Sequence, residues 1–292
     1  MSLRYVVGYV FVVAVLMLWL LGVPDVGRGS AAASDPAAGQ TVRIAVCQTL
    51  CIDSDPEGNL RRVAYALADA ADQGAQIACF PETAVLGWVN PDAHALAHPI
   101  PGPTTDHLAA LAVEHGMMIC IGLCEKDGED LYDSAVLISA QGEILAVHRK
   151  VNCLPGLMDP PYQPGGADGV RVVDTEFGRV GMLICADTFE AELLEAAKAQ
   201  SPDLMLVPYG WAAGKGAWPE HGESLLACVS HVAERLACPV VGCNSVGSVS
   251  SGPWRGFVYG GQSPVAGAGG EPLGVLRDRQ PEVRVFEVEL NP

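Results

Sequence analysis

Three side chains of complementary chemistry stand at the ends of three apolar, strand-like runs of this sequence. Glu82 follows IACF and a proline, Lys150 follows ILAVHR, and Cys185 follows VGMLI. In layered α/β folds the carboxyl ends of strands are where side chains meet ligands, so these three could converge. A carboxylate can take the proton of a thiol, while an ammonium can lower the thiol's pKa and stabilise an oxyanion on an attacked carbonyl. The set therefore favours nucleophilic attack by Cys185 on an acyl carbon.

Each of these residues also has an ordinary structural interpretation. The chain has ten cysteines, and several, such as Cys47, Cys79 and Cys120, lie within apolar runs. Unreactive cysteine is among the most frequently buried residue types. Lys150 could be a solvated lysine at a strand end, and Glu82 could cap a helix. Residue type alone selects none of the three.

The surrounding segments resemble the signature blocks of a known family. CFPETAVLGW (79–88), HRKVNCLP (148–155) and GMLICAD (181–187) are similar, in order and spacing, to the three blocks of the nitrilase-like carbon–nitrogen hydrolases. Three ordered blocks are far more specific than any one of them. Three further stretches agree with the same family, namely Pro164-Gly165, Pro208 to Trp211, and GGQSPVAGAGGEPLG (260–274). The resemblance extends over about residues 41–290.

This resemblance implies a four-layer α-β-β-α sandwich whose subunits pair into homo-oligomers through an α face. By position, Cys185 would be the nucleophile that forms a thioester, and Glu82 the general base and acid. Lys150, with the backbone N–H of Ala186, would stabilise the tetrahedral intermediates. The implied reaction is hydrolysis of a non-peptide C–N bond in a small-molecule amide, carbamoyl compound or nitrile, with no cofactor and no metal.

The sequence departs from the family pattern around the lysine and the cysteine. Many members carry a second glutamate in the loop after the lysine, whereas residues 151–166 contain none, and Asp159 is the nearest acid. Ala186 stands where a bulkier aromatic residue is frequent, which predicts a wider pocket. Tyr209 and Trp211, after another strand-like run, complete the predicted pocket residues. Trp211 and Trp218 could equally pack in the core.

The elements that must position these residues alternate between strand and helix patterns. Residues 42–48, 76–80 and 117–124 have strand character, separated by helical periodicity at 59–73 and 103–115. Residues 132–139 and 143–149 flank a predicted hairpin turn. The remaining predicted strands are 170–185 as a pair, 203–209, 239–246, segments within 256–276, and 283–290, with helices at 189–200 and 219–238. The order predicts a mixed sheet layered with helices in one domain at 41–292.

The N-terminus differs in kind from the rest of the chain. Residues 5–23 carry no charge and could cross a bilayer core of about 30 Å as a helix. Arg4 precedes them, which places the catalytic domain on the non-cytoplasmic side. Small residues at 31–33 offer a cleavage site, so the alternatives are an uncleaved membrane anchor or a cleaved signal of an exported protein. Residues 24–40, rich in Pro, Gly, Ser and Ala, have the composition of a flexible linker.

Composition excludes some classes of partner and leaves the redox state of the thiols open. The net charge is −17 and the densest basic clusters, Arg61-Arg62 and His148 to Lys150, are short, which argues against nucleic-acid binding. His94 and His98 have a metal-ligand spacing, but no third ligand is evident, and Pro99 would break their helix. Export would favour disulfides, whereas cysteines in apolar runs resemble core thiols.

Two other functions compete with amide hydrolysis. An N-acyltransferase of the lipoprotein-processing type would combine this domain with several membrane spans, and this sequence has one candidate. A catalytically idle binding module could keep the fold. The presence of Glu82, Lys150 and Cys185 argues against the idle module, while the missing loop glutamate argues mildly for it.

Overall fold

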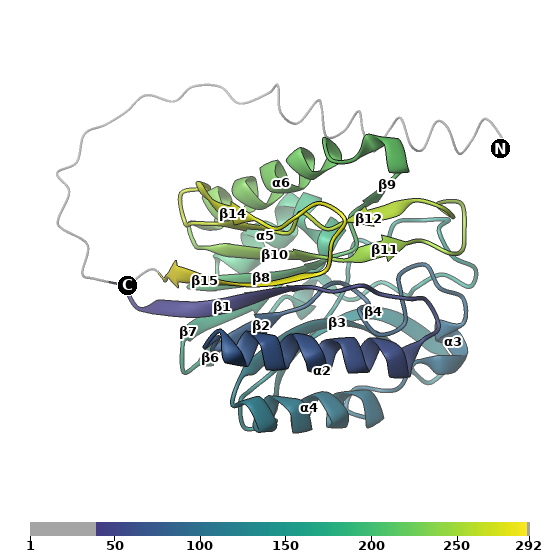
Figure 1. Cartoon of the computed structure of the whole chain (residues 1–292), viewed down its shortest axis with the longest axis horizontal. Helices are drawn as coiled ribbons and strands as arrows, with labels where there is room; N and C mark the ends of the chain where they lie inside the picture. Colours follow the sequence, from purple (N-terminus) through teal and green to yellow (C-terminus); the bar gives the residue numbers. More distant parts are fainter. Residues whose placement is uncertain (1–38, 291–292) are drawn as a thin grey trace. The chain divides into compact units, whose positions relative to one another are not determined.

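Two six-stranded β-sheets stacked face to face form the centre of this protein. The computed structural model describes residues 39–290, which belong to one compact unit. The first sheet has the order β15-β1-β2-β3-β4-β5 and the second the order β14-β13-β10-β8-β7-β6 (Figure 1). The strands of the first sheet are β1 (Thr41–Gln48), β2 (Ile77–Cys79), β3 (Met118–Asp127), β4 (Asp130–Ile138), β5 (Ile144–Arg149) and β15 (Glu282–Glu289).

The second sheet and a small third sheet come from the C-terminal half. The second sheet consists of β6 (Val172–Thr175), β7 (Gly178–Met182), β8 (Leu204–Tyr209), β10 (Val240–Asn244), β13 (Pro264–Ala266) and β14 (Pro272–Val275). Short strands β9 (Ala212–Ala213), β11 (Val246–Ser248) and β12 (Val258–Gly260) form the third sheet, in the order β11-β12-β9.

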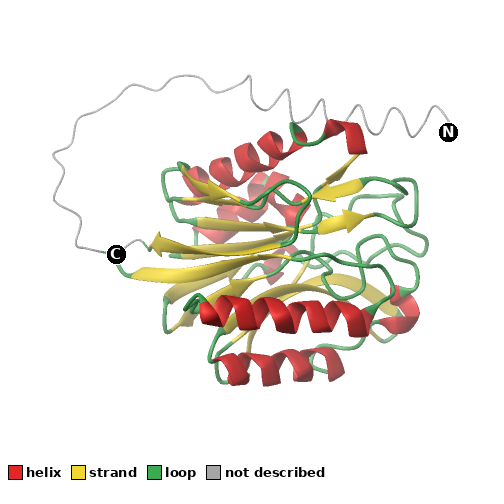
Figure 2. Cartoon of the chain, in the orientation of Figure 1, coloured by secondary structure: helices red, strands yellow, loops and turns green. Residues whose placement is uncertain are grey.

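Helices cover the outer faces of the two large sheets, as the red ribbons on either side of the yellow strands show (Figure 2). Helices α2 (Pro56–Asp72) and α4 (Pro103–His115) pack on the first sheet, and α5 (Ala191–Lys198) and α6 (His221–Leu236) on the second. A short helix α3 (Ala93–Leu96) and 3₁₀ turns at Ala167–Gly169, Cys185–Phe189 and Lys215–Ala217 lie in the connections. Each large sheet is therefore buried on both faces, which explains its nearly continuous apolar strands.

The main core lies between the two sheets. Ile44, Ile77 and Met118 of the first sheet belong to the same buried cluster as Met182, Leu206 and Val241 of the second. A second cluster fills the space between the first sheet and helices α2 and α4. Cys47, Cys79 and Cys120 are fully buried, and all ten cysteines are free thiols.

The directions of the strands place the carboxyl ends of β2 and β5 on the same side of the first sheet. β1, β2 and β3 are parallel, and β4 runs antiparallel to both β3 and β5. β5 therefore points in the same direction as β2, so the residues that follow these strands emerge on the same side. In the second sheet β7, β8 and β10 are parallel to one another, so their carboxyl ends also share one side.

The mixed α/β fold predicted from the sequence is confirmed. Helix α4 has the predicted bounds, and the hairpin predicted at 132–149 is β4 and β5. The helix predicted at 189–200 is shorter, because residues 185–189 form a 3₁₀ turn before α5. The short elements α3, β9 and β11 were not predicted, because their few residues carry no periodic pattern.

The predicted N-terminal segment falls outside the described residues. These exclude 1–38, and with them the apolar stretch 5–23 and most of the linker predicted at 24–40. Within residues 39–290, no helix is long and apolar enough to cross a membrane.

Candidate functional site

The three residues selected from the sequence lie close together where the two sheets pack against each other. Glu82 lies just after β2, Lys150 directly after β5, and Cys185 at the start of the 3₁₀ turn that follows β7. The Lys150 Nζ donates a hydrogen bond to Glu82 Oε1. The charges of both residues act on the Cys185 thiol. Each of the three is at least nine-tenths buried, so their interactions are only weakly screened by water.

The backbone at Cys185 adopts an unusual conformation. Its φ is +42°, in the left-handed region that non-glycine residues rarely occupy. Two hydrogen bonds hold this turn, from the Thr188 hydroxyl to the Cys185 carbonyl (2.6 Å) and from the Asp187 N–H to the Ile184 carbonyl (2.9 Å). Strained residues of this kind persist only where the surroundings fix them, and they cluster at functional sites.

Two glycines allow the backbone to approach Glu82 closely. A Cβ at Gly210 would lie 2.6 Å from Glu82 Oε2, and one at Gly122 would lie 2.5 Å from the Glu82 Cα. The Gly210 N–H also favours the charged form of the Cys185 thiol. Gly210 therefore contacts both the carboxylate and the sulfur, and its lack of a side chain brings them together.

The Cys185 thiol holds its proton in the resting protein. Burial raises its pKa well above the usual value, the negative charge of Glu82 raises it further, and Lys150 opposes both. From the sequence, Lys150 is expected to lower this pKa. Lys150 acts in that direction, but burial and Glu82 outweigh it. The thiolate must therefore form by proton transfer to a base, and Glu82 is the adjacent carboxylate.

Lys150 remains an ammonium although it is buried. Burial alone would lower its pKa, but Glu82 and Asp133 together raise it well above the usual value. Its Nζ also lies 5.6 Å from the centroid of the Trp88 ring, within reach of a cation–π attraction.

The second acid beside Lys150 is Asp133, which the sequence analysis missed. Asp133 Oδ2 lies 3.3 Å from Lys150 Nζ, and the Asp133 carbonyl accepts a hydrogen bond from the Lys150 backbone N–H at 2.8 Å. Asp133 sits in the middle of β4 and is 1% exposed. An acidic residue within an otherwise apolar strand pattern was the signal available in the sequence.

The sequence left open whether Asp159 takes the place of the second glutamate. Asp159 is exposed and is not among the residues that line the cavity beside Lys150. Its neighbour Met158 faces the cavity instead. The second acid beside Lys150 is instead Asp133 of β4.

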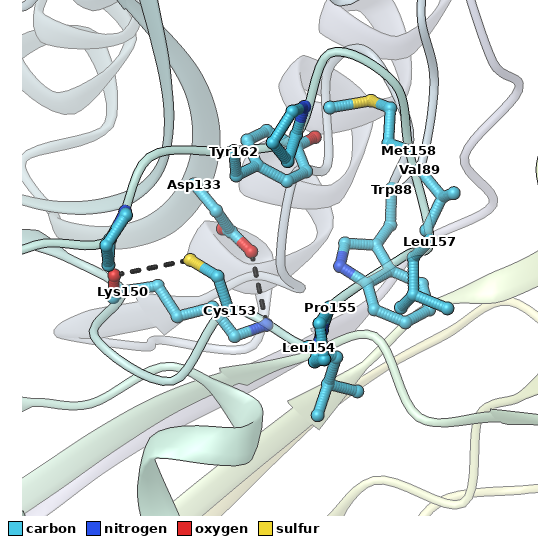
Figure 3. A pocket seen from close by; sticks show the side chains of 12 residues that line it. Trp88, Val89, Asp133, Lys150, Cys153, Leu154, Pro155, Leu157, Met158 and Tyr162 are labelled. Carbon is cyan, nitrogen blue, oxygen red and sulfur yellow. Dashed lines mark hydrogen bonds and ion pairs between the residues drawn. The ribbon is translucent and has the colours of Figure 1, made fainter. Parts of the chain in front are cut away.

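A cavity of about 210 Å³ opens beside Lys150 (Figure 3). Lys150, Asp133 and Cys153 line its polar side, and Trp88 and Tyr162 contribute aromatic surface. Its remaining lining is mainly aliphatic: Val89, Leu154, Pro155, Leu157, Met158, Pro161 and Pro164. The space suits a small, largely apolar group.

The other predicted pocket residues lie outside this cavity lining. Ala186 is fully buried, and Tyr209 directs its hydroxyl to Thr188 (3.4 Å). Trp211 packs edge-on against Phe189 and Tyr209, so it belongs to the core cluster. Of the two interpretations of Trp211, core packing is the one its contacts favour.

Asp187 links the cysteine turn to the segment that carries the lysine. Its Oδ1 accepts the backbone N–H groups of Val151 (2.9 Å) and Asn152 (2.8 Å). Its Oδ2 accepts the N–H of Ile184 (3.1 Å) and lies 2.8 Å from His148 Nε2. Burial would raise the pKa of Asp187, but the interaction with His148 and the backbone donors holds it below the usual value.

No group of three or more potential ligands in the described part of the chain could hold a metal ion. His94 contacts the Pro160 carbonyl, and His98 contacts the Thr104 hydroxyl. The two rings therefore have different hydrogen-bond partners.

Comparison with known proteins identifies the family. The sequence model of the carbon–nitrogen hydrolase family matches residues 43–291 of this chain. The chain belongs to the carbon–nitrogen hydrolase family. This membership in the nitrilase superfamily agrees with the resemblance found in the sequence.

Individual relatives include nitrilases and an amidase. The chain is 28% identical to a nitrilase of Pyrococcus abyssi, over 81% of this chain and 85% of that protein. It is 29% identical to a bifunctional nitrilase/nitrile hydratase of Nicotiana tabacum, over 72% of this chain but only 63% of the tobacco protein's length. The match thus spans less than two thirds of that relative.

Among solved structures, an amidase from Nesterenkonia sp. AN1 is similar throughout. A variant with an acetamide moiety covalently added at its active-site cysteine has a TM-score of 0.73 and 26% identity, covering 88% of this chain and 94% of that one. Another variant of the same amidase, in complex with butyramide, has a TM-score of 0.73 and 27% identity, covering 86% and 92%.

Replacing Asp187 by asparagine should destabilise the protein in a pH-dependent manner. The lowered pKa of Asp187 means that its contribution is present above the unfolded-state pKa of about 3.9 and is lost as the pH falls through the folded-state value. We expect D187N to lose about 3 kcal/mol of unfolding free energy at neutral pH, and less as the pH approaches 3. Urea denaturation across this range measures the difference.

Asp174→Asn is the matched control, because the Asp174 side chain is 93% exposed on β6. A change within about 0.5 kcal/mol is expected for it. If the loss of unfolding free energy in D187N stayed constant down to pH 3, this would contradict the negative charge assigned to Asp187.

Proposed function

We propose that this protein hydrolyses a non-peptide C–N bond of a small amide or N-carbamoyl compound through a thioester on Cys185. The observation that carries the proposal is the buried Lys150 ammonium. It forms an ion pair with Glu82, and it interacts electrostatically with the Cys185 thiol. General base, cation and nucleophile in one water-poor site are the components of acyl transfer to sulfur.

The mechanism begins with proton transfer from Cys185 Sγ to Glu82 as the sulfur attacks the carbonyl carbon. The oxyanion that forms is stabilised by Lys150 and, as the family resemblance implies, by the Ala186 backbone N–H. Glu82 then gives its proton to the leaving nitrogen, which departs as ammonia or an amine and leaves the thioester. Water, deprotonated by Glu82, attacks the thioester and releases the carboxylic acid and the thiol.

The cavity beside Lys150 supports a small, uncharged acyl group as substrate. Its volume is about 210 Å³, and outside Lys150 and Asp133 its lining carries no charged side chain. A charged acyl chain would lose its hydration there without a partner. Short aliphatic amides fit these properties better than long or ionised ones.

Ammonia release from a panel of short amides, N-carbamoyl compounds and nitriles tests the proposal. Cys185→Ser should lower turnover by about 10³-fold or more, because the hydroxyl is a far weaker nucleophile at this site. Cys228→Ser is the control, since Cys228 lies in α6 and its contact with the Thr188 hydroxyl can be made by serine. Equal turnover in wild type and C185S would eliminate Cys185 as the nucleophile.

Gly210→Ala should impair the same reaction without unfolding the protein. The added methyl would contact Glu82 Oε2 and displace the base from the sulfur, so kcat/KM should fall by about 100-fold. Gly214→Ala is the matched control, because a Cβ at Gly214 meets nothing within 4 Å. If both variants kept wild-type kcat/KM, the close approach at Gly210 would be irrelevant to catalysis.

We further propose that residues 5–23 anchor the domain to a membrane or direct its export. The supporting observation is the uncharged apolar stretch preceded by Arg4 and followed by small residues at 31–33.

Membrane fractionation separates the two fates of this segment. An anchored protein stays with membranes after alkaline carbonate extraction, whereas a chain that begins at residue 39 does not. A cleaved protein is instead exported with a new N-terminus near residue 33, which intact mass measures. A full-length protein recovered entirely in the cytosolic fraction would rule out both.

A further inference from the structure

Asp133 has an incomplete set of partners for a buried carboxylate. Its Oδ2 lies 3.3 Å from Lys150 Nζ, while its Oδ1 is buried and has no hydrogen-bond partner among the described residues. Glu82 makes the closer contact with the same Nζ. Lys150 thus interacts with two acids unequally.

The charges at this site do not balance if both acids are ionised. Lys150 supplies one positive charge, and Glu82 and Asp133 would supply two negative ones, in residues no more than 2% exposed. An uncompensated buried charge costs several kcal/mol, and a carboxyl group avoids that cost by keeping its proton. Since Glu82 holds the closer contact with the ammonium, Asp133 is the acid that retains the proton.

We propose that Asp133 is a neutral, protonated positioning residue. Its uncharged carboxyl group holds Lys150 in place, and the positive charge of the ammonium pairs with Glu82 at rest and with the oxyanion during the reaction. The inference deepens the proposed function, because its catalytic consequence depends on that reaction. The protonation itself does not depend on it.

The titratable groups around Asp133 come from every element packed against it and support this assignment. They are Glu82 after β2, Cys124 on β3, Lys150 after β5, Cys153 and Tyr162 in the following loop, and Cys185. Only Lys150 among them is a cation. Burial raises the pKa of Asp133 well above its usual value, Glu82 raises it further, and Lys150 only partly opposes this.

A neutral Asp133 keeps the site uncharged overall throughout the reaction. At rest Glu82 and Lys150 cancel, with Cys185 a thiol. When Sγ attacks, Glu82 takes the proton and the oxyanion replaces it as the partner of Lys150. With an ionised Asp133 the oxyanion would form beside a second negative charge, which would destabilise it.

The protonation state of Asp133 determines how the stability difference between wild type and D133N changes with pH. Above the unfolded-state pKa of about 3.9, the folded protein would hold a proton that the unfolded chain has released, so wild-type stability falls as the pH rises. Asparagine has no such proton. The advantage of D133N over wild type should therefore grow between about pH 5 and pH 8. An ionised Asp133 with a lowered pKa would give a constant difference there.

The experiment compares wild type, D133N and D133A. We expect the denaturant midpoint of D133N to rise relative to wild type across this pH range, and the infrared carbonyl band of a protonated carboxyl group at neutral pH to disappear in D133N. Asp130→Asn, exposed at the start of the same strand, should change neither measurement. A constant midpoint difference, or a carboxyl band unchanged by D133N, would overturn the assignment.

Turnover supplies an independent measurement. Asparagine can accept the same hydrogen bond from Lys150, whereas alanine cannot, so kcat of D133N should exceed that of D133A by at least about tenfold. Equal kcat values in the two variants would refute the positioning role. If wild type hydrolyses no compound of the panel, the proposed function fails, while the infrared and stability measurements still decide the protonation of Asp133.

Discussion

The interaction on which the site depends is the burial of one ammonium, Lys150, between two carboxyl groups. A lysine at 2% exposure would lose its charge to desolvation if it lacked close anionic partners. Glu82 supplies the negative charge, and Asp133 supplies a second acceptor together with a backbone hydrogen bond. Because these groups come from three different strand regions of the first sheet, the ammonium stays charged only when that sheet is correctly assembled.

The two sheets contribute different components of the chemistry. The first sheet carries Glu82, Lys150 and Asp133, which the proposed mechanism uses as base, cation and second acid, whereas the second sheet carries Cys185 and Gly210. Asp187 joins them, since it accepts hydrogen bonds both from the cysteine turn and from the residues after Lys150. The distance between base and sulfur is therefore fixed by the packing of one sheet on the other, and a disturbance of that packing should reach the site directly.

The strand and helix pattern and the residues Glu82, Lys150 and Cys185 could be predicted because both depend on local sequence. Apolar periodicity places the elements, and the three ordered blocks that resemble the family, each at a strand end, select the three side chains. Asp133 could not be assigned in the same way, since its role depends on β4 pairing with β3 opposite Cys124 and on β5 lying beside it. The role of Asp159 could not be decided from the sequence, because distance along a loop says little about where its side chains lie.

The resting state of the thiol also follows from tertiary structure rather than from residue type. A lysine beside a cysteine suggests a thiolate, but burial and the negative charge of Glu82 reverse that expectation at Cys185. The positive charge of Lys150 is already matched by Glu82, so it can stabilise a new anion only when Glu82 becomes neutral. In the proposed mechanism, proton transfer from sulfur to Glu82 creates that condition at the moment the oxyanion appears. In that mechanism the same proton transfer activates the nucleophile and releases the cation for the transition state, so both events depend on attack at the carbonyl carbon.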